Sequence, residues 1–131
     1  TGQLLCKVGE SMSFDTTAFA SLTAADFSAN DQLAKMIGED EFASLFHQGE
    51  KESMYLADVA RRVILVVLFD ERTTVGLVRL RVRQTVRDLK TLFEEMFDRV
   101  EATAQNHGQA WQMLPKTPVA TLTRLAQLAL S

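Results

Sequence analysis

The sequence predicts an α/β (α+β) domain in which an antiparallel sheet is sandwiched by helices. A helical pattern of apolar residues runs through residues 16–37, and a meander of three short strands follows through residues 42–69. A second helical pattern occupies residues 84–100. The chain has 131 residues, of which 47% are hydrophobic and 24% charged, so it suits one globular domain.

Charge and cysteine content exclude several classes of protein. A net charge of −3 disfavours general nucleic-acid binding, which needs a basic surface. Cys6 is alone, so neither an intramolecular disulfide nor a cysteine metal cluster can form, and a reducing, cytoplasmic location fits. No apolar run approaches the ~18 residues of a membrane span. We therefore expect a cytoplasmic protein without membrane insertion.

The chain begins without an initiator Met and leads directly into an apolar stretch at residues 3–8. We interpret this stretch as a strand that starts just after a turn, with Cys6 as a core thiol. The abrupt start indicates a domain whose first elements are missing.

The helix predicted for residues 16–37 has clear signals at both ends. Asp15 is a good N-cap, Phe14 and Phe19 occupy the positions of a hydrophobic staple, and Gly38 is a candidate C-cap. The predicted core face consists of alanines and larger apolar residues at spacings of three and four: Ala18, Leu22, Ala25, Ala29, Leu33 and Ile37.

Three strands are predicted next, at residues 42–48, 53–59 and 63–69. In the first, Phe42, Ser44, Phe46 and Gln48 share one face because side chains alternate along a strand. The third strand, "VILVVLF", is apolar on both faces, which predicts a central strand covered on both sides.

The following stretch, "DERTTVGLVRLRVR", is compatible with two structures. Alternating valines, leucine and arginines could form a strand that closes a hairpin. As a helix, Val75, Val78 and Val82 continue without a slip into the helical register of Val86 and Leu89, with Thr73 or Thr74 as N-cap. The unbroken register favours the helix, although Gly76 and the valines lower helix propensity.

The C-terminal part changes character after about residue 100. We expect a domain at residues 1–100, a linker at 101–118 and a C-terminal amphipathic segment at 119–131. We interpret that last segment as a short helix that must dock on another surface to be stable.

The ordered set of stretches "GQLL", "DTTAFASLTA", "LAKMIGEDEF", "FHQGEKESMYL" and "RVILVVLFDERTTVGLVRLRVR" resembles the Roadblock domain family, over about residues 2–97. The resemblance implies a profilin-like sheet of five strands with one helix on one face and two on the other. It strengthens the helical interpretation of the stretch after residue 70. The family's N-terminal helix and first strand have no counterpart here, which implies four strands and a partly uncovered face.

The resemblance implies a non-enzymatic, homodimeric regulator that binds a small Ras-like GTPase. Such a regulator stimulates GTP hydrolysis by repositioning the switch loops of the GTPase, and controls cell polarity and motility. The alternative is a dimeric scaffold that assembles a signalling or motor complex without GTPase activation. A small-molecule sensor is disfavoured, since no polar cluster falls within an apolar cavity. The C-terminal segment would contact the GTPase or cover the protein's own core.

Two surfaces carry the predicted interactions. The outward face of the helix at residues 16–37 is the expected GTPase surface, formed by Ala24, Phe27, Ser28, Asp31 and Gln32. The strand at residues 42–48 would pair with its copy in a second subunit through a dimer interface at Phe42, Ser44, Phe46 and Gln48.

No catalytic, cofactor-binding or metal site is predicted. His47 lies near Glu50 and Glu52, but a metal site needs further well-placed ligands, so we interpret it as an ordinary strand histidine. The arginines at 79, 83 and 87 form a ladder along one helix face, which we interpret as a solvated face paired with Asp88, Glu94 and Glu95. A patch that binds phosphate or an acidic partner is the alternative.

Overall fold

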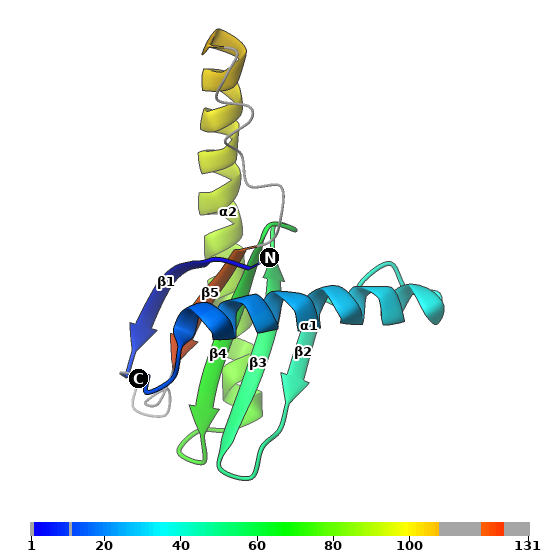
Figure 1. Ribbon diagram of the computed structural model, residues 1–131, viewed down its shortest axis with the longest axis vertical. Coiled ribbons are helices and arrows are strands. Elements are labelled where there is room, and N and C mark those ends of the chain that lie inside the picture. Colours follow the sequence, from blue (N-terminus) through cyan, green and yellow to red (C-terminus); the bar gives the residue numbers. More distant parts are fainter. Residues whose placement is uncertain (1, 11, 108–118, 125–131) are drawn as a thin grey trace.

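A computed structural model describes residues 2–10, 12–107 and 119–124, with only the backbone described at 104–107 and 119–124. Within these ranges, one mixed five-stranded sheet has a helix on each face, as Figure 1 shows. The elements follow in the order β1 (Leu4–Gly9), α1 (Thr16–Met36), β2 (Ser44–His47), β3 (Glu52–Val59), β4 (Val63–Asp70), α2 (Val75–His107) and β5 (Val119–Arg124). Across the sheet the strand order is β1-β5-β4-β3-β2.

Strand β4 joins two hydrophobic cores. Val63, Leu65 and Val67 pack toward α2 with Tyr55, while alternate residues such as Ile64 pack toward α1. Every residue from Val63 through Phe69 is buried, which confirms the predicted central strand covered on both faces. The α+β fold with helices on both sides of the sheet is therefore confirmed.

Helix α1 begins where the sequence predicted. The Asp15 carboxylate accepts hydrogen bonds from the backbone N–H groups of Thr17 and Ala18, at 3.0 and 3.2 Å. The rings of Phe14 and Phe19 lie 4.9 Å apart and form the staple. Gly38 adopts a φ of 88° just after the helix, the left-handed conformation typical of a C-terminal glycine.

Helix α2 settles the two interpretations of the stretch after residue 70. The hydroxyl of Thr74 accepts a hydrogen bond from the N–H of Leu77 at 3.3 Å and caps the helix. Val78 and Val82 are buried against the sheet, so the helical register determined by the valines is confirmed and the hairpin is excluded. The helix continues to His107, so residues 101–107 are helical rather than part of a linker; residues 108–118 lie outside the described ranges.

The C-terminal segment differs from the prediction. Val119–Arg124 is not a helix but strand β5, which lies between β1 and β4 and is parallel to both. The expected sheet of four strands thus has five, and only the pairings among β2, β3 and β4 are antiparallel. The backbone groups of β1 and β4 supply β5 with hydrogen-bond partners that sequence periodicity cannot reveal. Residues 125–131 lie outside the described ranges.

The predicted core face of α1 is also wrong. Ala20, Thr23, Ala24, Phe27 and Ala34 are buried, whereas Leu22, Leu33 and Ile37 are exposed. Ala20, Ala24 and Phe27 also follow spacings of four and three, so the pattern alone could not choose between the two faces. A tight contact helps to set the rotation: Gly2 lies so close to Ala20 and Ala24 that a Cβ there would come within 2.6 Å of each.

Cys6 is exposed rather than part of the core. It lies on β1, the strand at one edge of the sheet, where Leu5 and Val8 are exposed as well. An edge strand has a neighbour on one side only, so its side chains are less completely covered.

Deleting residues 119–131 should lower the melting temperature, because β5 is the strand that pairs with both β1 and β4. Exposing the edge of β4 and detaching β1 should lower the free energy of unfolding by more than about 1 kcal/mol. In a small domain this loss lowers the melting temperature by roughly 4 °C. Thermal unfolding followed by circular dichroism measures the shift. Deleting residues 125–131 is the control, and the difference in melting temperature between the two deletions isolates the contribution of β5. Equal melting of the two deletions would contradict the role of β5.

Candidate functional site

The predicted GTPase surface on α1 is only partly accessible. Ala24 and Phe27 are 8% and 6% exposed and pack in the core beneath α1, so they cannot contact a partner. Asp31 is half-buried, while Ser28 and Gln32 are exposed. The assignment of Ala24 and Phe27 to a solvent face was wrong because it followed from the inverted rotation of the helix.

The outward face of α1 is instead an apolar stripe. We define the α1 stripe as the exposed residues Ala18, Leu22, Ala25, Ala29 and Leu33. Leu22 and Leu33 are 71% and 54% exposed, and the α1 stripe is flanked by Ser28 and Gln32. A continuous apolar face on an exposed helix is typical of an interaction surface, and its three alanines permit a close approach.

A polar contact joins α1 to the neighbouring edge of the sheet. The Nε2 atom of His47 on β2 lies 2.8 Å from Oδ2 of Asp26 on α1, and Oδ1 of Asp26 accepts a hydrogen bond from Asn30 at 3.1 Å. His47 therefore binds a carboxylate of the protein itself, and no group of His, Cys, Asp and Glu in the described ranges could hold a metal ion. No local pattern in the sequence indicates this pair, since 21 positions separate its members.

Strand β2 forms the other edge of the sheet, beside β3. Of the four residues predicted for the dimer interface, Ser44 and Phe46 lie in β2, whereas Phe42 and Gln48 lie just outside it. Asp58 on β3 donates its N–H to the carbonyl of Ala43, so the backbone of Ala43 faces β3. By alternation, the backbone groups of Ser44 and Phe46 point away from β3 toward the open edge.

Phe46 is only partly free for a second subunit. Its ring centroid lies 6.0 Å from that of Phe69 and 6.5 Å from that of Tyr55, so it already packs on the face of the sheet that carries α2. The open edge therefore offers backbone groups at Ser44 and Phe46, with the Phe46 ring beside them.

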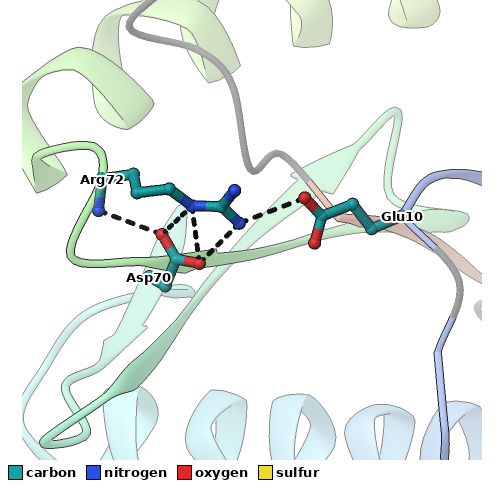
Figure 2. A network of polar contacts seen from close by, with 3 residues as sticks. All are labelled: Glu10, Asp70 and Arg72. Carbon is teal, nitrogen blue, oxygen red and sulfur yellow. Dashed lines mark hydrogen bonds and ion pairs between the residues drawn. The ribbon is translucent and has the colours of Figure 1, made fainter.

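An arginine in the turn after β4 is held by two carboxylates of the protein, as Figure 2 shows. Arg72 donates from Nε to Oδ1 of Asp70 at 3.0 Å and from Nη2 to Oδ2 of Asp70 at 2.7 Å. Its Nη2 also donates to Glu10 at 3.1 Å. These hydrogen bonds raise the pKa of Arg72, and the bond to Asp70 contributes most. The hydrogen bonds of Arg72 connect the end of β1 to the start of α2. They also hold this loop arginine, which could otherwise reach into a partner.

Asp58 lies at the end of β3, beside the tight turn to β4. Ala60 and Arg61 have φ values of 55° and 60°, as the two central residues of a type I′ turn require, and the Asp58 carboxylate accepts the N–H of Arg61 at 3.1 Å. Burial raises the pKa of Asp58; the hydrogen bond from Arg61 opposes this shift, and the charges of Glu41 and Asp31 add to it.

Among the described residues, the helices lack the long apolar stretch that a membrane span requires.

The family of the chain follows from comparison with known domains. A model of the Roadblock/LC7 domain matches residues 1–69, and the chain belongs to this family.

Solved structures give a more particular likeness, which is to MglB. The chain is 49% identical to Myxococcus xanthus MglB, with a TM-score of 0.64 over 67% of this chain and 72% of that one. It is 30% identical to the gliding protein MglB from Thermus thermophilus, with a TM-score of 0.56 over 67% and 64% of the two chains. A structure described as MglB with tetrameric arrangement is 32% identical, with a TM-score of 0.56 over 67% and 63%. The search of curated proteins finds no match.

Replacing Asp58 by asparagine should raise stability at neutral pH. The folded-state pKa of Asp58 lies above its ordinary value of 3.8, so the folded protein binds more protons than the unfolded chain between these two pKa values. The free energy of unfolding therefore falls as pH rises through that window, and above it the ionised carboxylate destabilises the folded protein. The amide of the asparagine keeps an oxygen that can accept the N–H of Arg61.

Urea unfolding at pH 7 and at about pH 3.5, below the ordinary carboxylate pKa, measures this effect. The gain in unfolding free energy should be present at pH 7 and disappear in acid. A difference of the same size at both pH values would contradict the titration of Asp58 as its cause.

Proposed function

We propose that the protein is a non-catalytic, homodimeric regulator that binds a small Ras-like GTPase of the MglA type and stimulates its GTP hydrolysis, and so controls cell polarity and motility. The observation that carries this proposal is the exposed α1 stripe on a Roadblock domain that resembles MglB at 49% identity. An apolar helix face that the protein's own core leaves uncovered needs a partner.

The mechanism keeps phosphoryl transfer inside the GTPase. Arg72 is held by Asp70 and Glu10. The exposed arginines at 79, 83 and 87 lie on α2, across the sheet from the α1 stripe, so we assign this chain no side chain at the γ-phosphate. The α1 stripe instead selects the conformation of the switch loops in which the GTPase's own residues reach the γ-phosphate. Stimulation then depends on how much more tightly the α1 stripe binds this conformation than the resting one.

The apolar side chains of the α1 stripe are large enough for this task. Shifting a conformational equilibrium from 1:99 to 99:1 requires about 5.5 kcal/mol of differential binding. Burial of one exposed leucine side chain contributes roughly 1.5–3 kcal/mol. Leu22 and Leu33 are both largely exposed, and a dimer presents each of them twice. Contacts made only with the competent switch conformation therefore reach the required magnitude.

The homodimer would form through the open edge of β2. Antiparallel pairing of two β2 strands satisfies the outward N–H and C=O groups of Ser44 and Phe46 and joins the two sheets into one. The isologous geometry brings the two α1 helices to the same side of that continuous sheet, where their stripes form one surface.

Single-turnover GTP hydrolysis by the cognate GTPase, with and without this protein, tests the proposal. Substituting Ala25→Glu places a charge in the middle of the α1 stripe and should weaken GTPase binding by more than tenfold, about 1.4 kcal/mol, with loss of the rate increase. The matched control is Ala102→Glu at an exposed alanine on α2. Both variants should melt like the unaltered protein.

Absence of any acceleration by the unaltered dimer would refute the proposed activity. Binding without acceleration would instead identify a scaffold, the alternative that the Roadblock fold allows.

Substituting Ser44→Pro should weaken the dimer while preserving the subunit fold. Proline removes the N–H that points to the open edge, and an edge strand tolerates this loss because the missing bond is not one to β3. Ser44→Ala retains the N–H and serves as control. Sedimentation equilibrium should show an increased dissociation constant for Ser44→Pro alone, by roughly tenfold or about 1.4 kcal/mol. Equal dimer affinity of the two variants would exclude pairing through β2.

A further inference from the structure

A groove lies on the face of the sheet that carries α2, between that helix and β2. Its volume is about 490 Å³. The floor is largely apolar and buried, with Tyr55 and Ala57 from β3 and Val82 from α2. Val86 extends the floor along the helix, and Ser44 marks the side of the groove toward the sheet edge. Since α1 covers the opposite face, the groove is separate from the α1 stripe (Figure 1).

Three arginines of α2 line one side of this groove. Arg79, Arg83 and Arg87, the arginine ladder, are exposed and follow one another at intervals of four residues. Their backbone positions are thus about 6 Å apart along the helix axis. Like charges at this interval destabilise a helix by roughly 0.2–0.5 kcal/mol per pair. The arginine ladder therefore lowers the stability of α2 unless a bound group neutralises its charge.

The nearby acidic residues do not neutralise the arginine ladder. Within the described part of the chain, none of these three guanidinium groups has a hydrogen bond or ion pair with a protein group, so the predicted pairing with Asp88, Glu94 and Glu95 does not form. Asp58 also lines the groove, but its carboxylate accepts the backbone N–H of Arg61. The groove thus combines an apolar floor with three unpaired cations.

We propose that this groove binds an acidic amphipathic helix of a partner protein. Glutamates at every fourth position of such a helix recur at the same interval of about 6 Å as the arginines, so successive ion pairs stay in step. An extended strand repeats every second residue at about 6.7 Å and so departs from the spacing of the three arginines by about 1.4 Å over the two intervals. Apolar side chains of the bound helix contact the floor at Tyr55 and Val86.

A nucleic acid fits these observations less well. The chain has a net charge of −3, and the groove offers one row of cations above an apolar floor with Asp58 at its margin. A phosphate backbone favours a broad basic surface and gains little from buried valine and alanine. The proposed site is independent of GTPase binding, because the two surfaces lie on opposite sides of the sheet.

The test uses a dye-labelled helical peptide with glutamate at every fourth position and leucine on the adjoining face, titrated with the full chain by fluorescence anisotropy. Single Arg→Gln substitutions at 79, 83 or 87 should each lower affinity about threefold, and the triple substitution more than tenfold, as for partly exposed charge pairs. Arg99→Gln, at an exposed arginine of α2 outside the groove, is the matched control. Affinity should also fall as sodium chloride is raised.

A charge exchange makes the result specific to the arginine ladder. Arg83→Glu should reduce binding of the glutamate peptide, and a peptide with lysine at the facing position should recover most of the loss. Glutamine retains the helix propensity of arginine and removes the repulsion between like charges, so the Arg→Gln variants should melt at or slightly above the temperature of the unaltered protein.

Three results would overturn the proposal. The first is equal binding of the glutamate peptide by the unaltered protein and the triple variant, and the second is no binding by the unaltered protein at about 1 mM peptide. The third is binding of a single-stranded oligonucleotide more tightly than the peptide, with loss in the triple variant, which would assign the arginine ladder to nucleic acid.

Discussion

The two-sided burial of β4 is the constraint on which the rest of the structure depends. Its side chains alternate between the core under α1 and the core under α2, and those from Val63 through Phe69 are all buried. A strand of this kind is stable only when both faces of its sheet are covered, because each exposed large aliphatic side chain forfeits roughly 1.5–3 kcal/mol. The helices must therefore occupy opposite faces, and each leaves one surface for a different partner.

The order of elements through α2 and the ends of α1 were predictable because local signals determine them. Asp15, Thr74 and the unbroken valine register of α2 act through neighbours in sequence. The rotation of α1 and the nature of β5 were not predictable. Two apolar stripes compete on α1, and Phe27 with the close contact at Gly2 decides between them only in the folded chain. Strand β5 exists because β1 and β4 offer it backbone partners.

The candidate surfaces were foreseen in kind more than in detail. The sequence indicated that the outer face of α1, the edge at Ser44 and Phe46, and the arginines of α2 were the places to consider. It assigned Ala24 and Phe27 to the wrong side of α1 and paired the arginines with acids that they do not contact. Contacts such as Asp26 with His47 and Arg72 with Glu10 join positions 21 and 62 residues apart, so only the tertiary fold could reveal them.

Helix α2 is much longer than the sheet that it covers. Its 33 residues extend about 50 Å, whereas an eight-residue strand extends about 27 Å, and Figure 1 shows the distal half of the helix projecting beyond the sheet. The Cζ atom of Arg62, in the turn between β3 and β4, lies 5.1 Å from the centre of the Phe97 ring and so contacts α2 near the rim of the sheet. The chain between His107 and Val119 can span at most about 40 Å, so the far tip of α2 lies within that distance of β5. While β5 stays paired in the sheet, motion of the tip of α2 away from β5 is therefore limited to that distance.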